Sequence, residues 1–234
     1  MKCAIMQPTY LPWAGYFSMI DYVDVFVFLE DVQFSRRSWQ QRNRINFKGQ
    51  EKWLTVPVKK TGLRNQIIKD VEIVNHEWKI KHFNLIKEAY TGAPYFKDII
   101  YIFEKSILNN TSLLLRDINI QFIQEVMKYL DINTKIIFSS TLKLEGKKSE
   151  YLLKICEELS AEEYISAPGS IEYIEEEGLF RKSNIKIQIF NTQVVEYDNF
   201  KIDDFIPYMS ILDVIAYNGP DLTKKYLKCI RGEK

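Results

Sequence analysis

The sequence predicts an α/β fold with a mainly parallel, three-layer sheet and a helical insertion at about residues 75–130. Short segments with strand character alternate along the chain with segments of helical periodicity, which is the pattern of β-α-β units. Segment 25–29 is continuously apolar, as expected for a strand buried on both faces of a parallel sheet. A chain of 234 residues without a Gly- or Ser-rich linker suits a single domain over 1–234.

The first part of the chain reads as a strand, a helix and a second strand. Residues 3–6 form a short apolar strand, and residues 7–16 form a loop with two prolines and a glycine. A helix over 17–22 and a strand over 24–29 follow. After an arginine-rich loop, residues 53–58 predict a third strand.

The middle of the chain is helical. The pattern predicts helices over 77–90 and 95–129, separated at Thr91–Pro94 because proline blocks a continuous helix. These helices make up the predicted insertion.

The sheet pattern then resumes. Ser149 is the expected N-cap of the first later helix, and Asn218-Gly219 the expected end of the last one. The predicted strands cover 135–138, 164–166 and 185–190, and the predicted helices cover 149–159, 171–177 and 209–217.

Composition excludes several classes of protein. The 32 basic and 31 acidic residues give a net charge of +1, which argues against a general nucleic-acid or membrane-surface binder. Three cysteines without metal-ligand spacing predict no metal site, and the start of the chain has no signal-peptide pattern. No apolar run reaches the length of a membrane span. We therefore expect a cytoplasmic protein.

The loop after the first predicted strand carries an amide, hydroxyls and aromatic rings ahead of a helix N-terminus. Free backbone N–H groups there favour an anion, and Gly15 would let a phosphate approach closely. The alternative is a rigid turn packed with aromatic side chains. The candidate binding residues are Gln7, Thr9, Tyr10, Trp13, Gly15 and Tyr16.

Two acidic residues, Glu30 and Asp31, follow the second predicted strand. Ligands of such sheets bind at the carboxyl ends of the strands, where an acid contacts ribose hydroxyls. These carboxylates suit the hydroxyls or the amine of a sugar, a divalent ion, or simply a solvated strand end. Ser170 also follows a predicted strand, in a loop of small residues that leads into a helix. Such a loop favours the binding of a phosphate group.

Four arginines lie within nine residues. Guanidinium groups bind phosphate oxygens in pairs, and an indole among them can stack on a base or sugar, so a nucleoside diphosphate is the expected ligand. A solvated basic loop and RNA binding are the alternatives. The candidate residues are Arg36, Arg37, Trp39, Arg42, Asn43 and Arg44.

His82 shares a mostly apolar helix face with Trp78 and Ile86. It is either a hydrogen-bonded core residue or the general base that deprotonates an amine or hydroxyl nucleophile.

The first loop is similar in layout to that of the nucleotidyltransferases of the HUP superfamily, which have a Rossmann-like sheet. Trp13-Ala14-Gly15-Tyr16 stands where those proteins have His-x-Gly-His. Both histidines are missing, so the resemblance implies the backbone layout and not that mechanism.

A longer resemblance covers nearly the whole chain. The run Gln7–Phe17, the segments Asp24–Gln33 and Trp53–Val58, and Met209–Asp213 with Asn218-Gly219 look like the WbqC-like protein family. Members commonly have His where this chain has Met6. The resemblance implies a place in bacterial O-antigen and related surface-polysaccharide gene clusters and a glycine-transferase role.

Together these observations predict a transferase that attaches a glycyl or other acyl group to the amine of a nucleotide-linked amino sugar. The arginines would bind diphosphate, Trp13 and Trp39 would stack, and Glu30 and Asp31 would orient the amine. His82 would remove the proton, while Gln7, Thr9, Tyr10 and Asn43 would orient the donor or hold its oxyanion.

The acyl donor remains open between an acyl thioester, an aminoacyl-tRNA and an acyl adenylate made from ATP with magnesium. The alternative function is a non-catalytic protein that binds the sugar nucleotide and hands it to a partner enzyme. Which sugar and base it would bind, and the oligomeric state, do not follow from the sequence.

Overall fold

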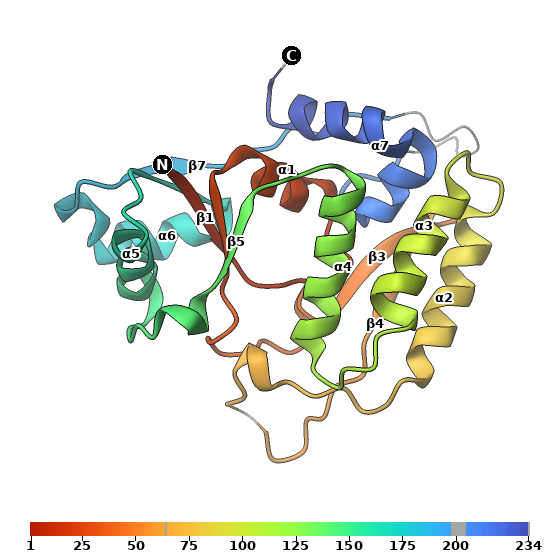
Figure 1. Cartoon of the computed structure of the whole chain (residues 1–234), viewed down its shortest axis with the longest axis horizontal. Helices are drawn as coiled ribbons and strands as arrows, with labels where there is room; N and C mark the ends of the chain where they lie inside the picture. The colour runs from red at the N-terminus through yellow and green to blue at the C-terminus, as the bar shows by residue number, and fades with distance from the viewer. Residues whose placement is uncertain (64, 198–204, 234) are drawn as a thin grey trace.

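The computed structural model describes residues 1–63, 65–197 and 205–233. At its centre is a five-stranded sheet in the order β5-β2-β1-β6-β7, in which every neighbouring pair is parallel (Figure 1). This confirms the predicted parallel sheet. The strands are β1 (Lys2–Met6), β2 (Val25–Phe28), β5 (Lys135–Phe138), β6 (Glu163–Ser166) and β7 (Lys186–Ile189).

Helices cover both faces of the sheet, as the apolar strands require. In β2 all four residues are buried: Phe26 and Phe28 belong to one apolar cluster, and Val25 and Val27 belong to another on the opposite face. The first cluster includes residues of α1 (Ala14–Tyr22) and α7 (Ile211–Ile230). The second includes residues of α5 (Lys148–Glu158) and α6 (Pro168–Glu177). The fold is therefore a three-layer, Rossmann-like α/β fold.

The order of the strands locates the ligand crevice of the sheet. From the central β1 the chain moves outward through β2 to β5, and it then returns to the other side of β1 for β6 and β7. In open α/β sheets, ligands bind at the carboxyl ends of the strands where this direction reverses. That point lies between β1 and β6.

The predicted strand 53–58 is a strand over 53–55 only, and it lies outside the parallel sheet. Strands β3 (Arg42–Phe47) and β4 (Gln50–Thr55) instead form a separate antiparallel hairpin. Its two turn residues, Lys48 and Gly49, both have positive φ, 54° and 80°. That geometry suits the right-handed twist of a two-residue hairpin.

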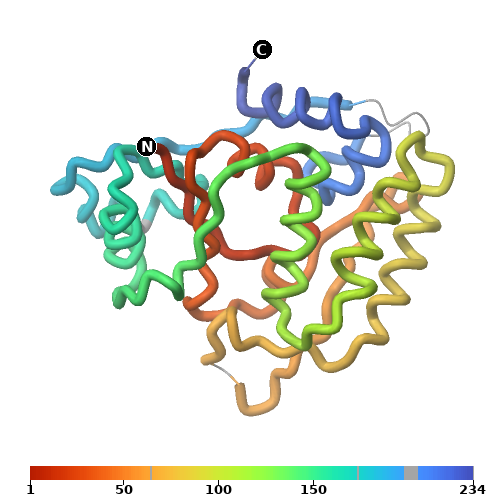
Figure 2. The backbone as a smooth tube through the Cα atoms, viewed as in Figure 1, coloured from red at the N-terminus to blue at the C-terminus, as the bar shows by residue number. Residues whose placement is uncertain are grey.

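Three α-helices lie between β4 and β5: α2 (Glu77–Tyr90), α3 (Phe96–Phe103) and α4 (Leu115–Tyr129). In Figure 2 they run side by side, next to the hairpin. They follow a short 3₁₀ turn, Ile68–Asp70. The range of α2 agrees with the prediction.

The single helix predicted over 95–129 was wrong. After α3 the chain makes a π-helical turn, Glu104–Leu108, and then leaves the helix before α4 begins. In this break the Asn110 side chain accepts a hydrogen bond from the Ser112 N–H. Such local side-chain bonds compete with the helical pattern.

One predicted helix boundary was also wrong. Ser149 is not an N-cap, since α5 begins one residue earlier and the Ser149 hydroxyl donates to Glu177 of α6. Gly219 does end the helix predicted over 209–217, since its φ of 64° and ψ of −167° are not helical. Helix α7 is therefore two helical segments joined at a kink, and Pro220 begins the second, unpredicted segment, which continues to Ile230, because proline is tolerated in a first helical turn. Two 3₁₀ turns, Ser139–Leu142 and Phe180–Lys182, complete the described elements.

Candidate functional site

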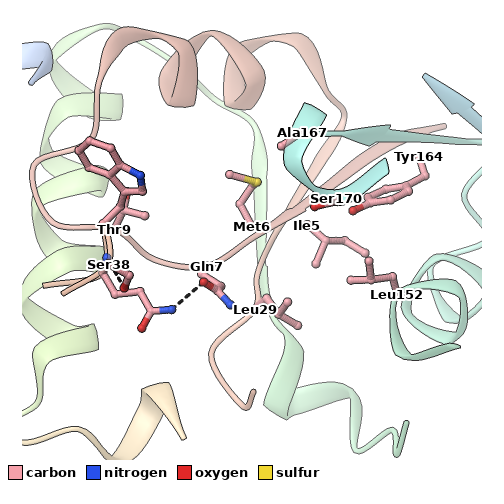
Figure 3. A pocket seen from close by; sticks show the side chains of 12 residues that line it. Ile5, Met6, Gln7, Thr9, Leu29, Ser38, Leu152, Tyr164, Ala167 and Ser170 are labelled. Atoms are coloured by element: carbon pink, nitrogen blue, oxygen red, sulfur yellow. Dashed lines mark hydrogen bonds between the residues drawn. The ribbon is translucent and has the colours of Figure 1, made fainter. Parts of the chain in front are cut away.

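A cavity of about 330 Å³ lies at the point where the strand order reverses. Figure 3 shows Met6 and Gln7 at its centre, with Thr9 and Ser38 on one side and Tyr164 and Ser170 on the other. We call it the switch-point cavity. Its lining residues come from β1, β6, α5, α6 and the loops after β1 and β2: Ile5, Met6, Gln7, Thr9, Leu29, Ser38, Trp39, Gln40, Leu152, Tyr164, Ala167 and Ser170.

A second cavity, of about 300 Å³, adjoins the first, since Met6, Thr9 and Trp39 line both. We call it the aromatic cavity, because four of its eight lining residues carry aromatic rings. The two cavities together are called the cleft. The aromatic cavity is lined by Met6, Thr9, Trp13, Tyr16, Trp39, Asn43, Arg44 and Tyr208.

Buried amides hold the loop after β1 in place. Asn43 of β3 donates to the carbonyls of Tyr10 and Leu11, at 3.2 and 2.8 Å. Asn119 of α4 donates to the carbonyls of Pro8 and Gln40, at 3.2 and 2.8 Å. Leu11 has a φ of 44°, in the left-handed region, so this backbone needs such support. Strand β3 and helix α4 thus hold in place the loop that carries Gln7 and Thr9 of the cleft.

At the N-terminus of α1, where an anion was expected, the structure places the Trp13 ring against Gly15. A Cβ added to Gly15 would lie 2.2–2.7 Å from ring atoms of Trp13, so the indole occupies the space expected for a phosphate. Trp13 also meets Tyr208 edge to face, with the ring centres 5.2 Å apart. Because Gly15 has no side chain, the Trp13 ring can lie against it and form one aromatic wall of the cleft.

Replacing Gly15 with Ala should push the Trp13 ring out of the aromatic cavity. We expect a changed tryptophan emission spectrum and a loss of stability of about 1–3 kcal/mol, the usual cost of overpacking. Gly169→Ala is the matched control, because no heavy atom lies within 4 Å of its added Cβ. Equal spectra and equal urea midpoints for the two variants would contradict this role of Gly15.

Glu30 and Asp31 are engaged by protein partners. The fully buried Glu30 carboxylate accepts from Arg116 at 2.6 Å and from the Ser140 N–H at 3.1 Å. Asp31 accepts from the hydroxyls of Ser139 and Tyr151, at 2.5 and 2.6 Å. Neither residue lines the cleft. This network ties the end of β2 to α4 and α5 and leaves both carboxylates already hydrogen-bonded.

The four arginines that were predicted to bind diphosphate do not come together at one site. Arg44 lines the aromatic cavity and pairs with Glu51 at 2.5 Å, while Arg42 lies over the Trp53 ring. Arg36 donates to the carbonyls of Lys60 and Leu63 at 2.6 and 3.1 Å. Arg37 is exposed, and of the four only Arg44 is among the residues that line the cleft.

His82 is a buried residue outside the cleft. It is 6% exposed, and its Nδ1 lies 2.8 Å from the hydroxyl of Tyr10. Its ring packs edge to face with Trp78 at 5.0 Å. Burial lowers the pKa of His82 to about 4, so the ring is neutral near pH 7. Tyr10 is fully buried beside it and does not line the cleft either.

The structure therefore brings eight of the predicted binding residues to the cleft, namely Gln7, Thr9, Trp13, Tyr16, Trp39, Asn43, Arg44 and Ser170. Sequence reasoning missed Met6, Tyr164 and Tyr208 as binding residues. Met6 could have been predicted, because it is the last residue of β1 and ligands bind at the carboxyl ends of such strands. Tyr208 had none, since it reaches the cleft through tertiary packing alone.

The cleft offers little titratable chemistry of its own. Among the described residues, the two linings contain no carboxylate, imidazole or thiol, and Arg44 is their one cation. In the described part of the chain, no three His, Cys, Asp or Glu residues are placed to hold a metal ion. Among the described helices, none is long and apolar enough to cross a membrane.

The fold and the cleft define a Rossmann-like α/β protein with a ligand-sized site at the switch point of its sheet. A family model described as the WbqC-like protein family matches residues 7–225, and the chain belongs to this family. It is 32% identical over 241 residues to the uncharacterized protein Rv1507c of Mycobacterium tuberculosis (strain ATCC 25618 / H37Rv), covering 98% of this chain and 99% of that one. No solved structure matches the chain significantly.

Proposed function

We propose that the cleft binds a nucleotide-linked amino sugar and that the protein transfers a glycyl or other acyl group to the sugar amine, in the cytoplasm, for O-antigen or related surface polysaccharide. The observation that carries this proposal is the pair of adjoining cavities at the switch point, one of them walled by aromatic rings around a guanidinium. Membership of the WbqC-like protein family agrees with it, since the sequence resemblance to that family implies such a role.

The chemistry of the aromatic cavity matches such a ligand. Flat aromatic faces stack on a base or on the apolar face of a pyranose. Arg44 is half-buried beside them, and a guanidinium in that setting binds phosphate oxygens strongly. The sugar nucleotide would therefore lie with its base or sugar between the rings and its diphosphate near Arg44.

The switch-point cavity would hold the acyl group next to the sugar amine. Its walls are largely apolar, with the amide of Gln7 and the hydroxyls of Thr9 and Ser170 available to orient a carbonyl. In the transfer, the amine nitrogen attacks the acyl carbonyl, the new C–N bond forms, and the bond to the donor's leaving group breaks. Holding the two reactants together is the main contribution of a site like this one.

The second candidate is a non-catalytic protein that binds the sugar nucleotide for a partner enzyme. The absence of a carboxylate, imidazole or thiol from the linings of the described cleft favours it. Product analysis separates the two candidates. Acylated sugar nucleotide formed only with the protein present supports transfer, and tight binding without product from any of the three donor classes supports the alternative.

A thermal-shift panel tests the binding proposal. Nucleoside diphosphates and nucleotide-linked amino sugars of different bases would be compared with coenzyme A thioesters and ATP with magnesium. A ligand present at a hundredfold excess over its Kd adds about 2.7 kcal/mol of stability. We expect one nucleotide sugar to give such a shift and Arg44→Gln to abolish it.

Arg36→Gln is the matched control, because Arg36 bonds to loop carbonyls away from the cleft. The control should keep the shift. A panel in which no nucleotide sugar stabilises the protein would overturn the proposed function.

A further inference from the structure

An exposed pair of stacked indoles lies on the rim of the cleft. Trp39 and Trp53 are 48% and 41% exposed, and their ring centres lie 5.5 Å apart at an interplanar angle of 28°. Trp39 lines both cavities, whereas Trp53 lines neither. The stack therefore starts inside the cleft and continues out of it onto the surface of the hairpin.

Two arginines on the same face of β3 flank these rings. The Arg42 guanidinium lies 4.4 Å from the centre of Trp53, and that of Arg44 lies 5.5 and 5.6 Å from Trp39 and Trp53. Arg44 is paired with Glu51. Within the described residues, no carboxylate lies at ion-pair distance from Arg42, so its charge is free to meet an anion. We call Trp39, Trp53, Arg42 and Arg44 the stacking platform.

This combination is characteristic of sites for single-stranded nucleic acid. Exposed aromatic rings stack on successive bases, and neighbouring guanidinium groups contact the phosphates between them. A sugar nucleotide has one base and would fit within the cavities, so it leaves the outer ring unused. The net charge of +1 and the small area of the platform suit a short unpaired end rather than a long polynucleotide.

We propose that the acyl donor is an aminoacyl-tRNA, whose unpaired 3′ end runs along the outer part of the platform, with a base on Trp53 and a phosphate at Arg42, and directs the aminoacyl ester into the switch-point cavity. This inference rests on the proposed transferase function and deepens it by naming the donor. The sugar amine attacks the ester carbonyl, the C–N bond forms, and the C–O bond to the terminal ribose breaks. The amine proton ends on the released ribose hydroxyl.

The composition of the cleft agrees with this donor. An aminoacyl ester is already activated, and its conversion to an amide is downhill, so the step requires neither ATP nor a covalent intermediate on the protein. The cleft accordingly needs no nucleophilic thiol, and its described lining residues include none. An acyl adenylate shares the adenosine of the tRNA end but has no second base to occupy Trp53.

Binding of a short RNA hairpin with an unpaired 3′ CCA end, followed by fluorescence anisotropy, tests the platform. We expect Trp53→Ala to weaken binding about tenfold, as for the loss of one base-stacking ring. Arg42→Gln should weaken RNA binding. It should also reduce the dependence of the binding constant on salt by the amount expected for the loss of about one phosphate contact. Tyr101→Ala, which removes a ring that is 60% exposed on α3, is the control and should bind normally.

The donor itself is tested by transfer of labelled glycine to the nucleotide sugar from glycyl-tRNA, glycyl adenylate or a glycyl thioester. Transfer from glycyl-tRNA that falls in Trp53→Ala, while the thermal shift with nucleotide sugar is kept, supports the inference. Transfer from another donor only, or equal binding of the CCA hairpin and its blunt form, overturns it. A retained thermal shift would then show that the proposed sugar-nucleotide site survives that failure.

Discussion

Replacing Arg116 with Ala should destabilise the protein by about 3–5 kcal/mol, which is the usual result of removing one partner of a buried ion pair. The physical reason is Glu30, whose side chain is 0% exposed and accepts from Arg116 at 2.6 Å. Without the guanidinium, that carboxylate either stays charged in an apolar surrounding or takes up a proton. Urea unfolding monitored by circular dichroism measures the loss.

Two further variants make this prediction specific. Adding Glu30→Gln to Arg116→Ala should restore part of the lost stability, since the uncompensated charge is gone. Lys59→Ala is the matched control, because its ion pair with Glu72 joins side chains that are 52% and 44% exposed, and such pairs contribute under about 1 kcal/mol. Similar losses for Arg116→Ala and Lys59→Ala would show that burial of Glu30 is not what makes this pair important.

The parts of the fold that follow from local patterns were predictable. The continuous apolar run in β2 identified a strand buried on both faces, and the rule for strand ends placed Gln7, Thr9 and Ser170 at the cleft. The hairpin was missed because its turn uses Lys48, a residue that rarely adopts positive φ. Without that turn, β4 reads as another strand of the parallel sheet.

The partners of the candidate residues could not be predicted, because they come from distant parts of the chain. Glu30 and Asp31 were placed correctly at the end of a strand, but Arg116 and Tyr151 reach them from α4 and α5. The same holds for His82, whose ring is hydrogen-bonded to Tyr10 from the first loop. A spacing pattern shows which side chains share an element, and only tertiary structure shows which are already engaged.

Two buried titratable groups should give opposing pH dependences of stability. Burial lowers the pKa of His82 to about 4 and raises the pKa of Asp213 to about 6. Between pH 6.5 and 4 the unfolded chain binds a proton at His82 that the folded protein does not, so this residue destabilises the fold as pH falls. Asp213 binds its proton more readily in the folded protein, so it stabilises the fold over much of the same range.

Each contribution is worth about 2–3 kcal/mol between pH 7 and pH 4, so in the unmodified protein the two nearly cancel. Asp213→Asn, which keeps an oxygen for the Tyr197 hydroxyl, should therefore lose about 2 kcal/mol more than the unmodified protein over that interval. His82→Gln should lose about 3 kcal/mol less. Urea unfolding at pH 4, 5.5 and 7 measures these slopes. If the stability of all three proteins changed with pH in the same way, neither group would have the protonation state that its burial implies. The assignment of His82 as a neutral, non-catalytic residue would then fail.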